Sequence, residues 1–120
     1  MTIQYVGVFV STAGQGGGQE STVIATMSTF AHHGMIYVPL GFSQTSHILS
    51  DLNEVRGGSA WGAGTFAVSI AQSYNMICKQ LSDPHQQAGD GSRQPSAKEI
   101  ELAEIQGKSF FETVSKVSFT

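Results

Sequence analysis

A glycine-rich segment at residues 9–20 constrains the fold of this chain more than any other stretch, and it reads Phe-Val-Ser-Thr-Ala-Gly-Gln-Gly-Gly-Gly-Gln-Glu. It joins a run of apolar, partly β-branched residues at 4–10 to a region of helical periodicity that begins near Ser21. In open α/β sheets, ligands bind in loops at the carboxyl ends of the strands. Glycine lets the backbone approach a flat or phosphorylated ligand closely. The segment therefore predicts a ligand-binding loop between a strand and a helix.

The residues on either side of this loop predict a strand–helix–strand unit. Near-continuous apolar character at 4–10 is typical of a strand that is buried on both faces. Apolar residues at helical spacing predict a helix over 21–33, which Gly34 is expected to end. Residues 35–38 then predict a second strand. Two strands joined through a helix are expected to run parallel with a right-handed crossover, so the fold class is α/β.

The rest of the chain is less regular until its final helix. Residues 40–95 predict mostly loop, because the stretch 56–64 is too rich in glycine for either periodic element. Ser96 followed by Glu99 is a capping box and predicts where the last helix begins. One side of that helix is apolar and carries Ile100, Ala103, Gly107, Phe110, Val114 and Val117. With two strands and two or three helices, the predicted elements resemble half of a doubly wound domain.

Composition limits the class of protein and its location. A chain of 120 residues with 40% apolar residues and no break in composition predicts one globular domain. A formal charge of −3 without any cluster of Lys or Arg argues against nucleic-acid binding. A single cysteine, Cys78, excludes an internal disulfide and is typical of a reducing compartment. There is no apolar run of transmembrane length and no basic start of a signal peptide. The expected location is the cytoplasm, with peripheral attachment to a membrane left open.

The glycine loop does not have the features of a phosphate-binding loop. A Walker-type loop needs a lysine after its last glycine, but Gly18 is followed by Gln19 and Glu20. A dinucleotide-binding fingerprint also fails, because its third glycine would fall at Gln19. The loop is better suited to an uncharged ring system. A strand–helix turn that binds nothing remains the alternative on these residues alone.

Other candidate groups give weaker indications. His32 and His33 are adjacent on a helix and point about 100° apart, so they are not expected to chelate one metal ion. A histidine there either stabilises the end of the helix through the helix dipole or reaches the ligand. Trp61 is either a stacking platform or a packing residue at a subunit contact. No Gly-x-Ser-x-Gly motif supports a hydrolase, and no catalytic side chain is expected.

Four motifs in order resemble the WrbA-like NAD(P)H:quinone oxidoreductases, which are flavoproteins of the flavodoxin-like fold. They are residues 9–20, Ala-His-His-Gly-Met at 31–35, Glu-Val-Arg-Gly-Gly at 54–58 and Gly-Asp-Gly-Ser-Arg-Gln-Pro-Ser at 89–96. The resemblance implies FMN as cofactor, NAD(P)H as co-substrate, a quinone as substrate and a homotetramer. It covers only the carboxyl-terminal half of the family's domain. Residues 1–120 are therefore expected to form a partial flavodoxin-like fold, the last two strands of a doubly wound parallel sheet with flanking helices.

The resemblance also implies which residues contact the flavin. These are Ser11, Thr12, Ala13, Gly14, Gln15, Gly16, Gly17 and His32. The family usually has glycine at the position of Ala13, which adds a methyl group to the rim here. The family's phosphate-binding loop and its Thr-Arg-Phe-Gly segment do not occur in this chain. The alternative function is a non-catalytic flavodoxin-like subunit or truncated paralogue with an assembly role.

One block, residues 68–87, departs from the family pattern. Without it, Gly-Thr-Phe-Ala at 64–67 would join Ala-Gly-Asp-Gly at 88–91, as the family reads. The amino acids at its ends allow codons that match splice-donor, branch and acceptor sequences. We hypothesise a retained intron; the alternative is a true insertion in a surface loop, which chains tolerate. A peptide joining Ala67 to Ala88 in tandem mass spectra of the native protein would identify splicing.

Overall fold

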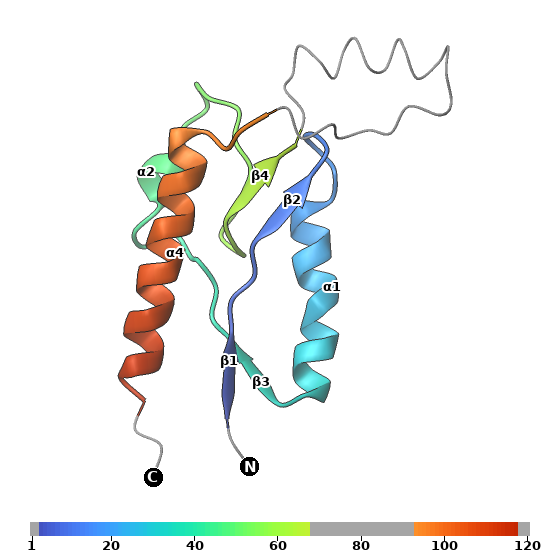
Figure 1. Ribbon diagram of the computed structural model, residues 1–120, viewed down its shortest axis with the longest axis vertical. Helices are drawn as coiled ribbons and strands as arrows, with labels where there is room; N and C mark the ends of the chain where they lie inside the picture. Colours follow the sequence, from blue (N-terminus) through green and yellow to red (C-terminus); the bar gives the residue numbers. More distant parts are fainter. Residues whose placement is uncertain (1–2, 68–92, 118–120) are drawn as a thin grey trace, which may run out of the picture.

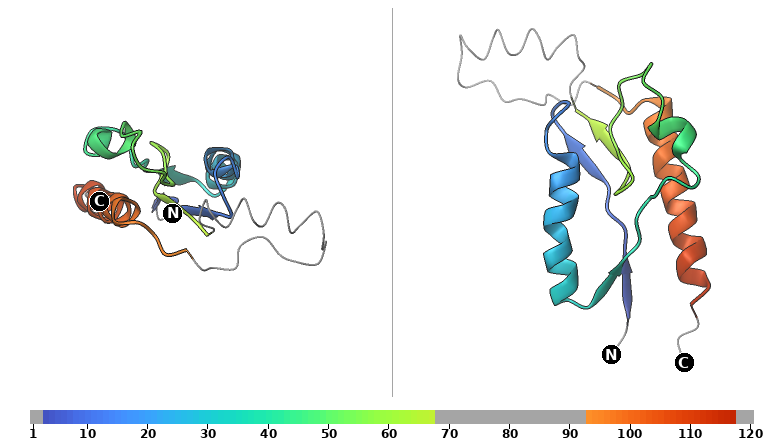
Figure 2. Two further views of the ribbon diagram at one scale, coloured as in Figure 1. Left: turned by 90° about the horizontal axis from the view of Figure 1, so that it is seen from above. Right: turned by 180° about the vertical axis from the view of Figure 1, so that it is seen from behind.

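The computed structural model describes residues 3–67 and 93–117, so the block at 68–87 lies outside the described residues. In chain order the described elements are β1 (Gln4–Val6), β2 (Val10–Thr12), α1 (Gln19–His32), β3 (Met35–Tyr37), α2 (Ser46–Leu49), β4 (Gly64–Phe66) and α4 (Ala97–Ser115). The strands lie between α1 and α4, and α2 lies beside the amino-terminal part of α4 (Figure 1, Figure 2). None of the described helices is long and apolar enough to cross a bilayer.

The strand predicted at 4–10 is wrong in its bounds. Residues 4–12 form two short strands, β1 and β2, with residues 7–9 between them. β1 pairs in parallel with β3, and β2 pairs in parallel with β4, so the described strands make two two-stranded sheets. The strand is interrupted at residues 7–9 because its two halves have different partners. The chain stops pairing with β1 after β3, and the segment that pairs with β2 is β4, further along the chain. Burial on both faces is also wrong, since Phe9 is 80% exposed.

The predicted strand–helix–strand unit is confirmed, with small changes at its ends. The helix begins at Gln19 rather than Ser21 and ends at His32. Gly34 ends it as predicted: its φ is +65°, and its N–H donates to the Ala31 carbonyl over 3.1 Å. The second strand covers Met35–Tyr37 and runs parallel to β1.

The expectation of loop over residues 40–95 is wrong at two places in its described part. A short helix, α2, covers Ser46–Leu49, and Gly64–Phe66 forms β4. Local composition did not favour a strand there. The segment forms a strand because β2 lies beside it and hydrogen-bonds to it. The Val10 N–H donates to the Ala63 carbonyl, and the Ala67 N–H donates to the Thr12 carbonyl. Tertiary contact therefore decides the conformation of this segment.

Close packing of main chain against main chain explains the glycines at residues 57–64. A Cβ built on Gly62 would lie 2.0 Å from the Val8 carbonyl oxygen. A Cβ on Gly57 would lie 2.6 Å from the carbonyl carbon of Gly64. These distances leave no room for any side chain, so glycine is required by space at both positions.

The apolar core is small and lies where α2, α4 and the start of β4 meet. It consists of Leu40, Ile48, Ala63 and Leu102, with Leu49 and Ile105 packed against it. The capping box predicted for α4 is confirmed, because Ser96 and Glu99 hydrogen-bond to each other's backbone N–H. The side of α4 that is buried, however, carries Glu99, Leu102 and Gln106. Much of the predicted apolar side is open, with Ile100 48% exposed.

We predict opposite effects of alanine at two glycines. Gly62→Ala should destabilise the chain by about 3 kcal/mol or more, because its Cβ has no space beside Val8. Gly107→Ala should stabilise it by about 0.5–1 kcal/mol, because Gly107 is within α4 and its Cβ would meet open space. Urea unfolding followed by circular dichroism measures both. Equal effects of the two substitutions would contradict the packing of residues 57–64.

Candidate functional site

The glycine loop lies at the carboxyl ends of β2 and β4, as the sequence predicted, and it is closed by its own hydrogen bonds (Figure 1). Thr12 Oγ1 donates to the Gly14 carbonyl over 3.1 Å, and Gly17 N–H donates to the same oxygen over 3.2 Å. A Cβ on Gly17 would lie 2.8 Å from Thr12 Cβ, so the turn needs glycine there. Gly18 caps α1 with φ +84°, a conformation that favours glycine. The loop therefore has one defined shape.

Gln19 connects this loop to two other segments. Its Nε2 donates to Thr12 Oγ1 over 3.1 Å and to the Thr65 carbonyl over 2.8 Å. Its Oε1 accepts the Gly58 N–H over 2.8 Å. One amide group thus holds β2, β4 and the glycine-rich segment at fixed distances. In the sequence analysis, Gln19 was only evidence against a Walker-type loop and a dinucleotide-binding fingerprint. In the structure, its side chain is the main support of the loop.

A hollow of about 310 Å³ lies beside the loop and is lined by Gly16, Gly17, Gly18, Gln19, Arg56 and Phe66, among others. Arg56 is the cation at its edge. The Arg56 guanidinium donates to the carbonyls of Ile48 and Leu49 at the end of α2. These bonds orient the guanidinium, so the hollow combines a glycine rim with one positioned positive charge, and the acidic residue Glu20 at the start of α1 also lines it.

Glu99 organises the side of the site next to α4. It is 3% exposed, and its Oε1 accepts the Gly57 N–H over 2.7 Å. Its Oε2 accepts from Arg93 over 2.7 Å and from Thr65 Oγ1 over 2.8 Å. Arg93 also donates to the Phe66 carbonyl and lies 5.8 Å from the centre of the Phe66 ring. The buried carboxylate therefore joins α4 to β4 and to residue 57.

Burial alone would raise the pKa of Glu99, because it disfavours the charged carboxylate. Hydrogen bonds from Arg93, Gly57, Ser96 and Thr65 outweigh burial and hold that pKa below its ordinary value of 4.5. The ionised form is therefore the one that the fold stabilises.

Trp61, whose role the sequence left open, belongs to a column of aromatic rings. The rings of Tyr37 and Trp61 stack with centroids 6.4 Å apart, and those of Phe30 and Tyr37 do the same. The Tyr37 hydroxyl donates to the Trp61 carbonyl, and burial raises the Tyr37 pKa. Trp61 therefore packs within the chain, while 37% of its surface remains exposed.

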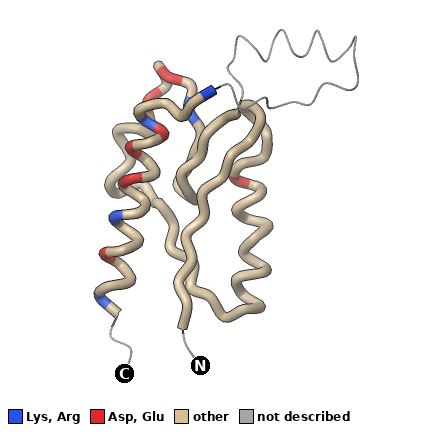
Figure 3. The backbone as a smooth tube through the Cα atoms, in the orientation of Figure 1, with Lys and Arg blue, Asp and Glu red and all other residues tan. Residues whose placement is uncertain are grey.

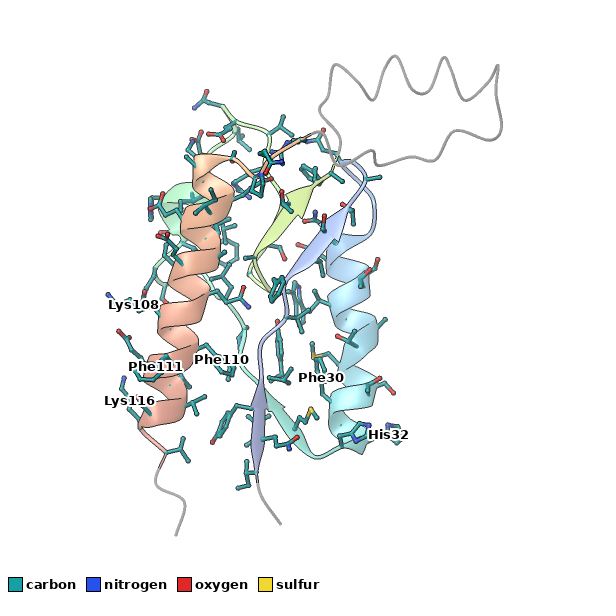
Figure 4. The ribbon with its side chains drawn as sticks, viewed as in Figure 1. Phe30, His32, Lys108, Phe110, Phe111 and Lys116 are labelled. Carbon is teal, nitrogen blue, oxygen red and sulfur yellow. The ribbon has the colours of Figure 1, made fainter. Side chains whose placement is uncertain are left out.

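The structure brings together seven of the eight residues expected to contact a flavin. Residues 11–17 are contiguous in the loop at the start of α1. His32 lies at the other end of α1 (Figure 4). At 1.5 Å per residue, the helix separates it from the loop by about 20 Å. Its Nδ1 lies 2.7 Å from the Ser28 carbonyl oxygen.

Sequence reasoning missed the buried and half-buried polar side chains that support the loop. Gln19 and Gln106 gave no signal at all, because glutamine is common on helix surfaces. Glu99 was found as a capping residue, but its bonds to residues distant in sequence were not. Among residues 3–67 and 93–117, no group of three or more His, Cys, Asp or Glu side chains is placed to hold a metal ion.

Comparison with known proteins shows similarity over nearly the whole chain. The minor allergen Cla h 7 of Davidiella tassiana is 53% identical over 116 residues, which is 97% of this chain and 47% of that protein. The NAD(P)H quinone oxidoreductase PST3 of Candida albicans is 48% identical over 110 residues, 92% of this chain and 45% of that protein. The minor allergen Alt a 7 of Alternaria alternata is 50% identical over 113 residues, 94% of this chain and 46% of that protein. No family model matches the chain.

The chain is thus homologous to proteins named NAD(P)H quinone oxidoreductases, and it spans slightly less than half the length of the curated relatives it matches. Its architecture is a small α/β arrangement of parallel strand pairs, compatible with part of a flavodoxin-like fold.

We predict that Glu99 makes the stability of the chain depend on pH. Because its pKa is lowered in the folded state, its stabilising effect is complete above the unfolded value near 4.5. The effect is then lost as the pH falls through the folded value. Glu99→Gln should cost about 2 kcal/mol at pH 7 and flatten the acid part of the profile. Denaturant unfolding between pH 7 and pH 3 measures this.

The matched control for that experiment is Glu101→Gln. Glu101 pairs only with the exposed His47 in the described structure, so its substitution should change stability by less than about 0.5 kcal/mol. If Glu99→Gln and the unsubstituted chain had parallel pH profiles, the assignment of Glu99 would be wrong.

Proposed function

We propose that this chain is the carboxyl-terminal part of an FMN-dependent NAD(P)H:quinone oxidoreductase with a flavodoxin-like domain. The observation that carries the proposal is a shaped glycine loop at the carboxyl ends of parallel strands, in a chain 48% identical to a protein named NAD(P)H quinone oxidoreductase. Such loops are where ligands bind in open α/β sheets. The proposed location is the cytoplasm.

The residues of the loop fit a flavin ring better than a phosphate. Residues 11–17 carry no cation, and Arg56 at the edge of the hollow is already engaged by two carbonyls. Glycines at the rim let the main chain lie against a flat ring, and Thr12 and Gln19 keep that rim in place. FMN, when bound, would accept a hydride from NAD(P)H and pass two electrons to a quinone. Charged groups for its phosphate would come from chain outside this sequence.

His32 fits this proposal only in an oligomer. A single chain places it about 20 Å from the glycine loop, so both cannot contact one ring. If His32 contacts the flavin, it does so from a second copy of the chain. The proposed flavin contact of His32 therefore requires the homo-oligomer that the resemblance implies, a tetramer.

A non-catalytic subunit with an assembly role is the second candidate. The observation in its favour is the number of large apolar side chains that the described chain exposes, such as Phe9 at 80% and Phe111 at 72%. Such side chains favour contact with other protein surfaces. Flavin binding distinguishes the two functions.

We predict weak FMN binding by the 120-residue chain and strong binding by a hybrid. In the hybrid, this chain replaces the matched region of Cla h 7, so that the part of the polypeptide in which we propose the phosphate-binding groups is present. The hybrid should bind FMN at least about a hundredfold more tightly than the chain alone, because charge-assisted hydrogen bonds to phosphate contribute most of the difference. Quenching of flavin fluorescence measures both affinities, and NADH or NADPH oxidation with a soluble quinone measures activity.

A substitution in the loop provides the specific test. Gly17→Val in the hybrid should weaken FMN binding, because its side chain would collide with Thr12 and open the rim. Ser115→Ala, which removes an exposed bond to the Glu112 carbonyl near the end of α4 and lies outside the hollow, is the matched control. A hybrid that folds but remains colourless with FMN would rule out the flavoenzyme proposal and leave the assembly role.

A further inference from the structure

The hollow beside the glycine loop carries one positive and one negative side chain, Arg56 and Glu20. Its volume of about 310 Å³ is at the low end of the range for small-molecule sites, about 300–1,000 Å³. Of the eight residues expected to contact the flavin, only Gly16 and Gly17 line it. Most of the hollow therefore lies next to the proposed flavin rim, with room for part of a second ligand.

The guanidinium of Arg56 is held on one edge and free on the other. Its Nε donates to the Ile48 carbonyl over 2.9 Å, and its Nη2 donates to the Leu49 carbonyl. These two nitrogens share one edge of the planar group, so the two carbonyls leave the opposite edge, with Nη1, without a partner in the described structure. The described ion pairs do not include Arg56 either. A fixed guanidinium with an unused edge is suited to binding a phosphate.

Glu20 is an isolated charge in the first half of the chain. It is the sole Lys, Arg, Asp or Glu among the described residues 3–50, so it does not belong to a charged surface (Figure 3). Its side chain is exposed and has no hydrogen bond or ion pair in the described structure. It also does not pair with Arg56, although both line the same hollow. An ionised carboxylate only accepts hydrogen bonds, so it is suited to hydroxyl groups and repels phosphate.

The surface between these two side chains is mostly main chain. The consecutive glycines at 16–18 project no side chain into the hollow, and a Cβ at Gly16 would meet nothing within 4 Å. A ligand can therefore lie against the backbone, with Phe66 as an apolar wall. The ligand that matches this site has an anionic group for Arg56 and hydroxyl donors for Glu20. A sugar phosphate has both.

We propose that the hollow binds the adenosine ribose and the adjacent phosphate of the nicotinamide co-substrate, and that Glu20 makes NADH the preferred form. Arg56 donates to the phosphate, and Glu20 accepts from the ribose hydroxyls. A carboxylate at the ribose 2′-hydroxyl is a known means of binding NADH, and it repels the 2′-phosphate of NADPH. The inference rests on the proposed function, because that function supplies the co-substrate.

Binding of a co-substrate fragment tests the hollow without any flavin. ADP-ribose and its 2′-phosphate derivative are titrated into the 120-residue chain, and the amide chemical shifts of Gly16, Gly18 and Gly58 are followed by NMR. ADP-ribose should bind at least about tenfold more tightly than the 2′-phosphate derivative, because like charges in contact are strongly unfavourable. Glu20→Gln should abolish this preference. Arg56→Met should weaken both ligands at least about tenfold.

Steady-state kinetics of the hybrid with the Cla h 7 segment test the same residue in the loaded protein. With a soluble quinone, kcat/KM should be at least about tenfold higher for NADH than for NADPH. Glu20→Gln should bring the ratio close to one, mainly by lowering the KM for NADPH. Its affinity for FMN should not change, since Glu20 is not among the residues expected to contact the flavin.

Two matched controls change the same charges outside the hollow. Glu104→Gln removes an exposed carboxylate from α4, and Lys108→Met removes an exposed cation from the same helix. Both should leave the affinity for ADP-ribose and the preference for NADH as they are. Circular dichroism checks folding of all variants. Glu20→Gln is the decisive one, because Arg56 also bonds to α2 and its loss can disturb that helix.

The possible outcomes separate this inference from the proposed function. Absence of ADP-ribose binding, or equal use of NADH and NADPH by the unsubstituted hybrid, would overturn the inference while FMN binding could still confirm the flavoenzyme. A preference for NADH that survives Glu20→Gln would also overturn it. Binding of ADP-ribose with the expected effect of Glu20→Gln, in a hybrid that binds no FMN, would confirm the ribose-phosphate site and contradict only the flavoenzyme.

Discussion

Three polar side chains, the buried Glu99 and Gln106 and the half-buried Gln19, hold the glycine-rich segment 57–64 in place, and the candidate site depends on them. Gln19 accepts from Gly58, Glu99 accepts from Gly57, and Gln106 accepts from Ala63 over 2.7 Å. Gln106 also donates to the Val8 carbonyl. Val8 lies between β1 and β2, so no neighbouring strand of the described structure donates a hydrogen bond to this carbonyl. Side chains thus supply the hydrogen bonds that a regular sheet would otherwise give to this backbone.

This arrangement connects the glycine loop to both helices. Gln19 is the first residue of α1, while Glu99 and Gln106 belong to α4, and all three bond to the segment between α2 and β4 or to its immediate neighbours. Each net hydrogen bond contributes only about 1 kcal/mol, but a buried donor left without a partner costs about 1–3 kcal/mol. Loss of one side chain therefore affects the loop, β4 and α4 together. The same rigidity gives the rim of the hollow a fixed shape before any ligand arrives, which lowers the entropy cost of binding.

Local patterns in the sequence were enough to predict α1 and α4, the parallel pair β1–β3 and the position of the loop, but not the short helix α2. Gly34 and the Ser96–Glu99 capping box act within one or two turns, so a single sequence reveals them. The division of residues 4–12 into two strands could not be predicted, because it results from where the chain leaves the sheet after β3. β4 was missed for a similar reason, since Gly64 becomes part of a strand only through its pairing with Val10. The roles of Gln19 and Gln106 depend on partners that are distant in sequence, at Thr65 and Val8.

Native-state hydrogen exchange tests most directly whether the three side chains hold segment 57–64. The amides of Gly57, Gly58 and Ala63 lie outside the regular strands, yet each donates to one of these side chains. They should exchange about as slowly as the Val38 amide, which bonds to the Val6 carbonyl beside β3, and far more slowly than that of the exposed Leu52. Replacement of Gln106 by alanine should release the Ala63 amide first. Exchange of all three amides at the rate of an unstructured peptide in the unsubstituted chain would contradict the central role of Gln19, Glu99 and Gln106.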